Sequence, residues 1–126
     1  MNFFVIIAVL VAGGLGAIIR HIAQSLAPAH PQRFPWAIFL VNVIGSFLAG
    51  LAAALGHSNI ITTDVSFVMI AGFCGGMTTM STFAVDSVAR MRIGQWQLAG
   101  MNVVGTAVVS LVAATGGLIV GGLPLW

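Results

Sequence analysis

The stretch from Gly72 to Phe83 places groups that can bind ions in the middle of an apolar segment. Its sequence is Gly-Phe-Cys-Gly-Gly-Met-Thr-Thr-Met-Ser-Thr-Phe, with three glycines and four hydroxyl side chains. Hydroxyl groups donate hydrogen bonds to an anion, and the carbonyls of an unwound helix coordinate a cation. In hydrocarbon, such an interruption is stable only where it packs against protein or lines a polar cavity. The stretch therefore predicts an ion site, and a simple kink is the structural alternative.

Three further polar side chains, Asn102, Thr106 and Ser110, follow one another at four-residue intervals. This spacing places them along one face of a helix, as a polar track. Threonine and serine in membrane helices often bond back to their own backbone. Asn102 and Asn42 require another explanation, because an unpartnered amide at membrane depth is costly. An interhelical hydrogen bond or a substrate path would each satisfy these amides.

Two other side chains could act on an anion. The edge of an aromatic ring is electropositive, so Phe83, beside Ser81 and Thr82, could present its edge to a small anion. Packing in the core is the simpler explanation of Phe83. Arg20 could attract anions by its charge, extend to the membrane surface, or bond the carbonyls of a helix end. Each residue therefore has a structural alternative beside the anion path.

The composition requires membrane helices to position these residues. Hydrophobic residues make up 60% of the 126, charged residues 5%, and the mean hydropathy is +1.13. A spanning helix needs roughly 20 apolar residues, and four segments qualify: Asn2 to Gln24, Pro35 to Leu55, Val65 to Val88, and Trp96 to Gly122. The sequence therefore predicts an all-α membrane protein with a single domain, residues 1–126, four transmembrane helices and an interruption in the third. It leaves no room for a soluble catalytic domain, so we expect no enzyme.

The few charged residues indicate how the chain lies across the membrane. A net charge of +2 is far too small for a nucleic-acid surface. With four spans, Arg33, Arg90 and Arg92 fall on one side, whereas Asp64 and His57 fall on the other. Because cytoplasmic loops are enriched in arginine and lysine, this distribution predicts that both termini lie outside the cytoplasm.

Small residues recur at helical spacing in three of the spans. The stripe in the second span consists of Asn42, Gly45, Ser46, Ala49, Gly50 and Ala53, and the pairs Gly72/Gly76 and Gly117/Gly121 repeat the four-residue interval. Small residues let helix backbones approach closely. Each stripe fits packing within one bundle or between subunits, and together they favour a tightly packed oligomer. Cys74, which lies among the glycines, is predicted to pack as a small apolar residue.

The sequence resembles the Fluc (CrcB) fluoride channels. The resemblance rests on the Gly72–Phe83 sequence, on Asn42 in the second span and on Gly-Ala-Ile-Ile-Arg ending at Arg20 in the first. It covers the whole chain, because the length, the four-span layout and the order of the motifs all agree. The run Gly-Gly-x-Thr-Thr-x-Ser-Thr-Phe is much more specific than a single glycine motif.

The resemblance implies an antiparallel dimer with two narrow fluoride pathways at its interface. Such a protein would release fluoride passively from the cytoplasm across a bacterial or archaeal plasma membrane, and so protect the cell from fluoride. The residues that match the family's fluoride path are Asn42, Met80, Ser81, Thr82, Phe83, Asn102, Thr106 and Ser110, with Arg20 near the entrance. A central structural sodium ion would be bound by backbone carbonyls, which map to Gly75 and Thr78. Asp86 falls where relatives often carry a glutamate.

Two features depart from the family pattern. Met80 occupies a position where the family usually has phenylalanine, so one of two pore aromatics is absent. A polarizable thioether could still present partly positive methyl hydrogens. The arginine bias is the second departure, because subunits that insert in both orientations should show little bias. A paired heterodimer with an oppositely oriented partner chain would explain both, and a homodimer remains the alternative.

Two other classes of membrane protein could share this four-span layout. A small multidrug-resistance-type transporter is also a four-span antiparallel dimer, but it requires a carboxylate deep in its first span for proton coupling. The first span here has none. A non-transporting interaction subunit would explain the small-residue stripes, but not the aligned amides and hydroxyls.

Overall fold

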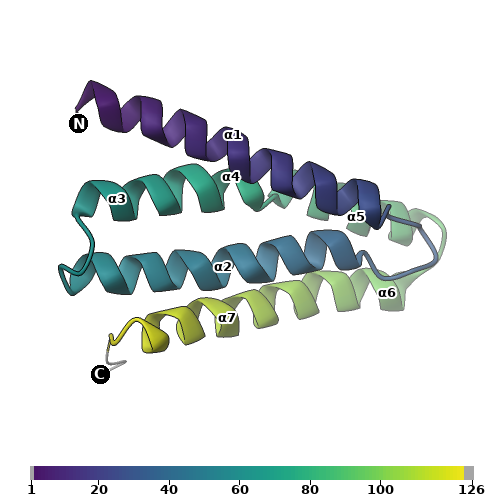
Figure 1. Cartoon of the computed structure of the whole chain (residues 1–126). Coiled ribbons are helices and arrows are strands. Elements are labelled where there is room, and N and C mark those ends of the chain that lie inside the picture. The colour runs from purple at the N-terminus through teal and green to yellow at the C-terminus, as the bar shows by residue number, and fades with distance from the viewer. Residues whose placement is uncertain (1, 124–126) are drawn as a thin grey trace.

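The computed structural model describes residues 2–123, in which the regular structure is helical and no strand occurs. Four helical segments are long and apolar enough to cross a membrane (Figure 1). The first two are α1 (Phe3–Leu26) and α2 (Trp36–His57). The third comprises α3 (Thr63–Phe67), the π-helix η1 (Val68–Cys74), α4 (Gly75–Met77) and α5 (Met80–Arg92), and the fourth comprises α6 (Trp96–Gly100), the π-helix η2 (Met101–Gly105) and α7 (Thr106–Val120). The four predicted spans are confirmed.

The third segment extends further than hydropathy predicted, because it ends at Arg92 instead of Val88. Helical hydrogen bonding does not require apolar side chains, and arginines in the last turn interact favourably with the helix dipole. Gly94, with φ of +78°, allows the chain to turn sharply after this helix.

The four segments lie side by side and alternate in direction (Figure 1). The N-terminus, the α2–α3 connection and the end of α7 lie at one end of the bundle. The α1–α2 connection and the α5–α6 turn lie at the other. Arg33, Arg90 and Arg92 therefore belong to one end, called here the arginine end, as the loop order predicted.

Glycines bring the helices together in two pairs. A Cβ atom on Gly76 would collide with the carbonyl of Gly13, so α4 and α1 pack backbone to backbone. A Cβ atom on Gly117 would collide with the carbonyl of Phe47, and one on Gly50 with that of Ala114, so α2 and α7 pack in the same way. Several glycines of the predicted stripes are therefore used inside one chain. For these glycines the intramolecular interpretation is correct, because their missing side chains are what permit the close contact.

The interruption of the third segment lies at two threonines. Thr78 (φ −79°, ψ 155°) and Thr79 (φ −148°, ψ 121°) have extended conformations between α4 and α5. The glycines of the same stretch are helical: Gly72 lies in η1, and Gly75 and Gly76 lie in α4. The glycines of this stretch are therefore not its extended residues: Gly72 and Gly76 pack against α1, and Gly75 remains helical. Cys74 is buried, as predicted.

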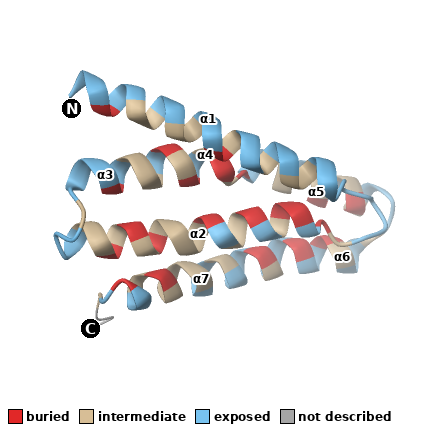
Figure 2. Cartoon of the chain, viewed as in Figure 1, coloured by how far each residue is buried: buried red, intermediate tan, exposed pale blue. Residues whose placement is uncertain are grey.

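Many residues of the bundle are exposed (Figure 2), and large apolar side chains are common among them. Leu10 and Leu111, for example, expose 69% and 71% of their area. Such side chains suit a hydrocarbon environment. The buried residues of the α5 helix are Ser87 and Arg90, both of them polar.

Candidate functional site

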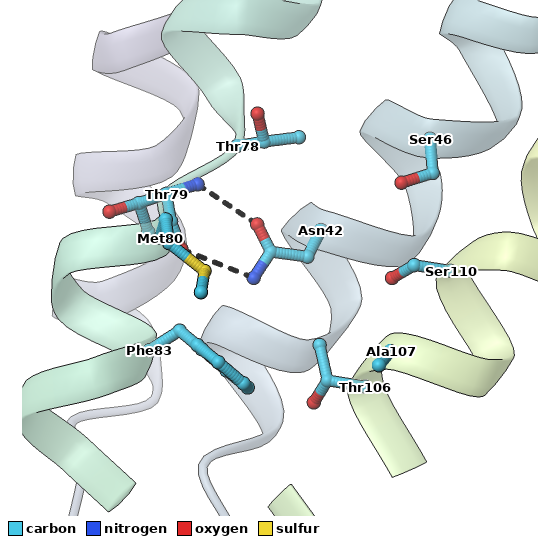
Figure 3. A pocket seen from close by; sticks show the side chains of 9 residues that line it. All are labelled: Asn42, Ser46, Thr78, Thr79, Met80, Phe83, Thr106, Ala107 and Ser110. Atoms are coloured by element: carbon cyan, nitrogen blue, oxygen red, sulfur yellow. Dashed lines mark hydrogen bonds between the residues drawn. The ribbon is translucent and has the colours of Figure 1, made fainter. Parts of the chain in front are cut away.

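A groove of about 320 Å³ runs between α2, α5 and α7 (Figure 3). The interrupted third segment forms one wall, and the facing sides of α2 and α7 form the other. Its nine lining residues are Asn42, Ser46, Thr78, Thr79, Met80, Phe83, Thr106, Ala107 and Ser110. None of the nine is charged, and five carry hydroxyl groups. The groove therefore offers hydrogen-bond donors without an acidic side chain.

Asn42 forms hydrogen bonds with the extended backbone that separates α4 from α5. The Thr79 N–H donates to Asn42 Oδ1 at 2.9 Å, and Asn42 Nδ2 donates to the Thr79 carbonyl at 3.4 Å (Figure 3). The side-chain amide thus pairs with both backbone groups of one extended residue, much as a neighbouring strand would. Thr79 is buried at 7% exposure, so its backbone groups need these partners. One amide hydrogen of Asn42 is not needed for this pairing and remains available to a ligand in the groove.

The hydroxyl groups of the groove are not equivalent. Thr78 Oγ1 donates to the Cys74 carbonyl at 3.0 Å, and Thr79 Oγ1 caps α5 by accepting from the N–H of Thr82 at 3.3 Å. Ser110 Oγ is buried and has no hydrogen-bond partner in the part of the chain that the structure describes. Because buried hydroxyls are usually paired, Ser110 is the groove side chain with the clearest unused capacity for hydrogen bonding.

A chain of hydrogen bonds lies behind the groove. Thr106 Oγ1 donates to Asn102 Oδ1 at 3.3 Å, and Asn102 Nδ2 donates to Ser87 Oγ at 2.8 Å. Ser87 Oγ in turn donates to the Phe83 carbonyl at 2.8 Å. Asn102 is completely buried. This network fastens η2 and α7 to α5 and fixes the backbone that carries Phe83.

Arg20, a residue of α1, contacts the extended residues between α4 and α5. Its Nη1 donates to the Thr78 carbonyl at 3.2 Å. Of the three roles that the sequence left open for Arg20, the structure contains the bond to a helix-end carbonyl. The guanidinium group therefore lies beside the extended residues of the third segment.

Comparison with known proteins identifies the chain as a member of a known family. The family model described as CrcB-like protein, Camphor Resistance (CrcB), matches residues 7–118. The chain belongs to the CrcB-like family. It is 39% identical to the fluoride-specific ion channel FluC of Opitutus terrae, over 90% of this chain and 87% of that protein. It is 33% identical to the FluC protein of Pyrococcus abyssi, over 94% of this chain and 97% of that protein.

The CrcB-like fold brings five of the eight predicted path residues into one groove: Asn42, Met80, Phe83, Thr106 and Ser110. The other three lie elsewhere. Asn102 is buried behind the groove, and Ser81 is exposed on α5. Thr82 lines a separate cavity near the arginine end. Successive residues of a helix point in different directions, so Ser81, Thr82 and Phe83 cannot all face one groove.

Three residues that matter to the CrcB-like groove were not predicted as site residues. Thr79 was part of the motif, and a threonine directly before a helix is a common N-cap signal. Ser46 follows Asn42 by four residues and therefore shares its helix face. Ser87 carried no recognisable signal, because its role depends on the position of Asn102 in another helix.

The predicted sodium ligands fit only in part. The Thr79 N–H would normally close the helical bond to the Gly75 carbonyl, but it donates to Asn42 instead, so that carbonyl stands at a helix end without this partner. The Thr78 carbonyl already accepts a hydrogen bond from Arg20, and a cation there would have to share this oxygen with a guanidinium group. Among the described residues, no cluster of three His, Cys, Asp or Glu side chains could hold a metal.

Proposed function

We propose that this protein is a fluoride-selective channel that releases fluoride passively from the cytoplasm. The observation that carries the proposal is the donor set of the uncharged groove. Ser110 presents an unpartnered hydroxyl group, Asn42 retains an amide hydrogen, and Phe83 can present the edge of its ring. The named FluC function of the relatives supports fluoride as the anion.

The donors would act by replacing water around the ion. Fluoride is small and strongly hydrated, so it enters a narrow site only where close donors compensate for the lost water. Selection would then depend on the spacing of the donors and the width of the path. Because Asn42 is bonded to Thr79, and the α5 backbone at Phe83 is tied through Ser87 to Asn102, the donor spacing would be fixed before the ion arrives.

We also propose that a second, antiparallel copy or a paired partner chain completes the path. The groove is open along one side in a single chain, and Met80 on its rim exposes 75% of its surface. A partner that covers this side would convert the groove into an enclosed pathway, and the symmetric arrangement would create two. The thioether of Met80 would contribute polarizable contacts where an aromatic ring is absent.

A structural sodium ion between the two subunits belongs to the same proposal. The carbonyls of Gly75 and Thr78 would bind it, with Thr78 using the oxygen lone pair that Arg20 leaves free. The interruption at Thr78 and Thr79 would then lie at membrane depth. The arginine end would face the cytoplasm of a bacterial or archaeal cell, according to the bias of Arg33, Arg90 and Arg92.

Efflux from liposomes tests the proposal. Purified protein is reconstituted with internal potassium fluoride, a proton-independent potassium conductance is opened with valinomycin, and external fluoride is followed with an electrode. Fluoride release with retention of chloride supports a selective channel, and the absence of release both from the chain alone and from the chain with a candidate partner refutes it. A multidrug-type transporter would instead require a coupling carboxylate in the first span, and α1 contains neither Asp nor Glu.

A further inference from the structure

The α5 helix is held in the bundle by polar contacts. Its two buried side chains, Ser87 and Arg90, are both polar, whereas helices in proteins are normally stabilised by a buried apolar face. Three attachments hold it. Asn42 pairs with Thr79 at its N-terminus, Asn102 bonds Ser87 in its middle, and Arg90 anchors its C-terminus. The position of α5, which carries Phe83, therefore depends on these contacts.

Arg90 makes the most extensive of these attachments. Only 1% of its surface is exposed, although it is charged. Its Nη2 donates to the carbonyls of Arg33 at 2.8 Å and His30 at 3.2 Å, and its Nε donates to Arg33 at 3.2 Å. Its Nη1 donates to the Asp86 carbonyl at 2.7 Å. All four bonds go to backbone carbonyls, and three of them join α5 to the α1–α2 connection. The rigid donor fork of arginine suits this arrangement, and lysine cannot reproduce it.

The two elements that Arg90 joins both contribute to the lining of the cavity near the arginine end. This cavity, of about 80 Å³, is lined by Thr82 and Asp86 of α5 and partly by Ala29 and Pro35 of the α1–α2 connection. Ala37, at the start of α2, also lines it and is buried. The bonds from Arg90 thus limit how far α5 and the α1–α2 connection can move apart beside this cavity.

We propose that Arg90 is a positioning residue for fluoride passage. It holds α5 and the α1–α2 connection at a single separation, which maintains the shape of this cavity and the placement of Phe83 at the groove. The proposal rests on the proposed channel function. Its physical basis is that an ion exchanging water for fixed donors tolerates little change in their spacing.

The first test compares Arg90→Gln with Arg92→Gln. Both substitutions remove one positive charge from the same helix, but Arg92 is exposed, so only the first removes the attachment. Efflux is measured in vesicles that contain at most one channel complex, which separates the rate per channel from the fraction of vesicles that release fluoride. We expect Arg90→Gln to lower the rate per channel on the order of 10-fold or more, because displacement of fixed donors by about 1 Å is costly. Arg92→Gln should leave it unchanged.

The second test measures the attachment without using transport. In a Cys74→Ala background, Ala37→Cys reports access to the cavity by its reaction with a small methanethiosulfonate reagent. The loss of a hydrogen bond from a charged donor shifts a local opening equilibrium by roughly 10-fold. Arg90→Gln should therefore accelerate labelling by at least about that factor, Arg90→Lys should have a smaller effect, and Arg92→Gln should have none.

A merely structural role for Arg90 would lower the fraction of active vesicles but leave the rate of each remaining channel unchanged. That result, or unchanged labelling of Ala37→Cys in Arg90→Gln, would overturn the proposal. If Arg90→Gln does not assemble, the same two measurements on Arg90→Lys decide it. If the parent protein releases no fluoride, the proposed function fails, and the labelling experiment still determines whether Arg90 fixes the cavity.

Discussion

Asn42 carries two duties that substitutions can separate, because it pairs with the Thr79 backbone and also faces the groove. Asn42→Asp keeps the acceptor for the Thr79 N–H and loses the long 3.4 Å bond to the Thr79 carbonyl. The loss of a neutral hydrogen bond costs roughly 0.5–1.5 kcal/mol. Asn42→Ala loses both bonds and leaves a buried N–H unpaired, which costs about 1–3 kcal/mol for that group alone. The ionised carboxylate adds a desolvation cost of its own, so we expect both variants to be less stable than the parent.

Fluoride flux should decrease more in Asn42→Asp than in Asn42→Ala. A carboxylate about 4 Å from fluoride repels it by roughly 4 kcal/mol at an effective dielectric constant near 20. This energy corresponds to a decrease in occupancy on the order of 10³-fold. Asn42→Ala loses an amide donor but introduces no charge, so its flux should decrease less.

Thermal unfolding in detergent measures the stability of the variants, and the fluoride-electrode assay measures their flux independently. Asn59→Asp is the control, because it makes the same substitution at an exposed position in the α2–α3 connection. If Asn42→Asp transports fluoride at the parent rate, Asn42 does not face the anion. If Asn42→Ala is as stable as the parent, the pairing with Thr79 does not contribute as described.

Three further predictions concern other parts of the molecule. Phe83→Ile should lower fluoride efflux from liposomes if the ring edge contacts the anion, and an unchanged rate would leave Phe83 as a packing residue. Gly117→Val should prevent close packing of α2 on α7 and reduce the yield of folded protein in size-exclusion chromatography, whereas Gly105→Ala, where no atom lies within 4 Å of the added carbon, should be tolerated. Replacing sodium by N-methylglucamine should lower the unfolding temperature of the assembled protein, and restoring sodium should reverse the loss; an unchanged temperature would argue against the sodium site.

The groove and its attachments suggest a division of labour among the polar residues. Asn102, Ser87 and Thr79 are buried and bonded within the chain, so their main contribution is to hold α5 in position. Ser110 retains an unpartnered hydroxyl group, which under the proposed function would donate to fluoride. Polar residues at membrane depth thus need not all lie on the ion path, since interhelical bonds satisfy several of them.

The sequence alone determined the class of the protein, its four spans and the common end of its arginines. These features follow from hydropathy and loop order, which are local properties of the chain. It also singled out the Gly72–Phe83 stretch as unusual in an apolar segment, and it named five residues that line the groove. Asn42 and Ser110 were recognised because polar groups are unusual in apolar helices.

Only the tertiary structure decided which of these polar groups are already paired. The amide of Asn102 has the same chemistry as that of Asn42, but one is buried behind the groove and the other lines it. The direction of a side chain depends on helix rotation and on the residue opposite, which lies far away in the sequence. For the same reason, Gly72 and Gly76 of the predicted interruption proved to be contacts of the third segment with α1, and the extended residues are Thr78 and Thr79.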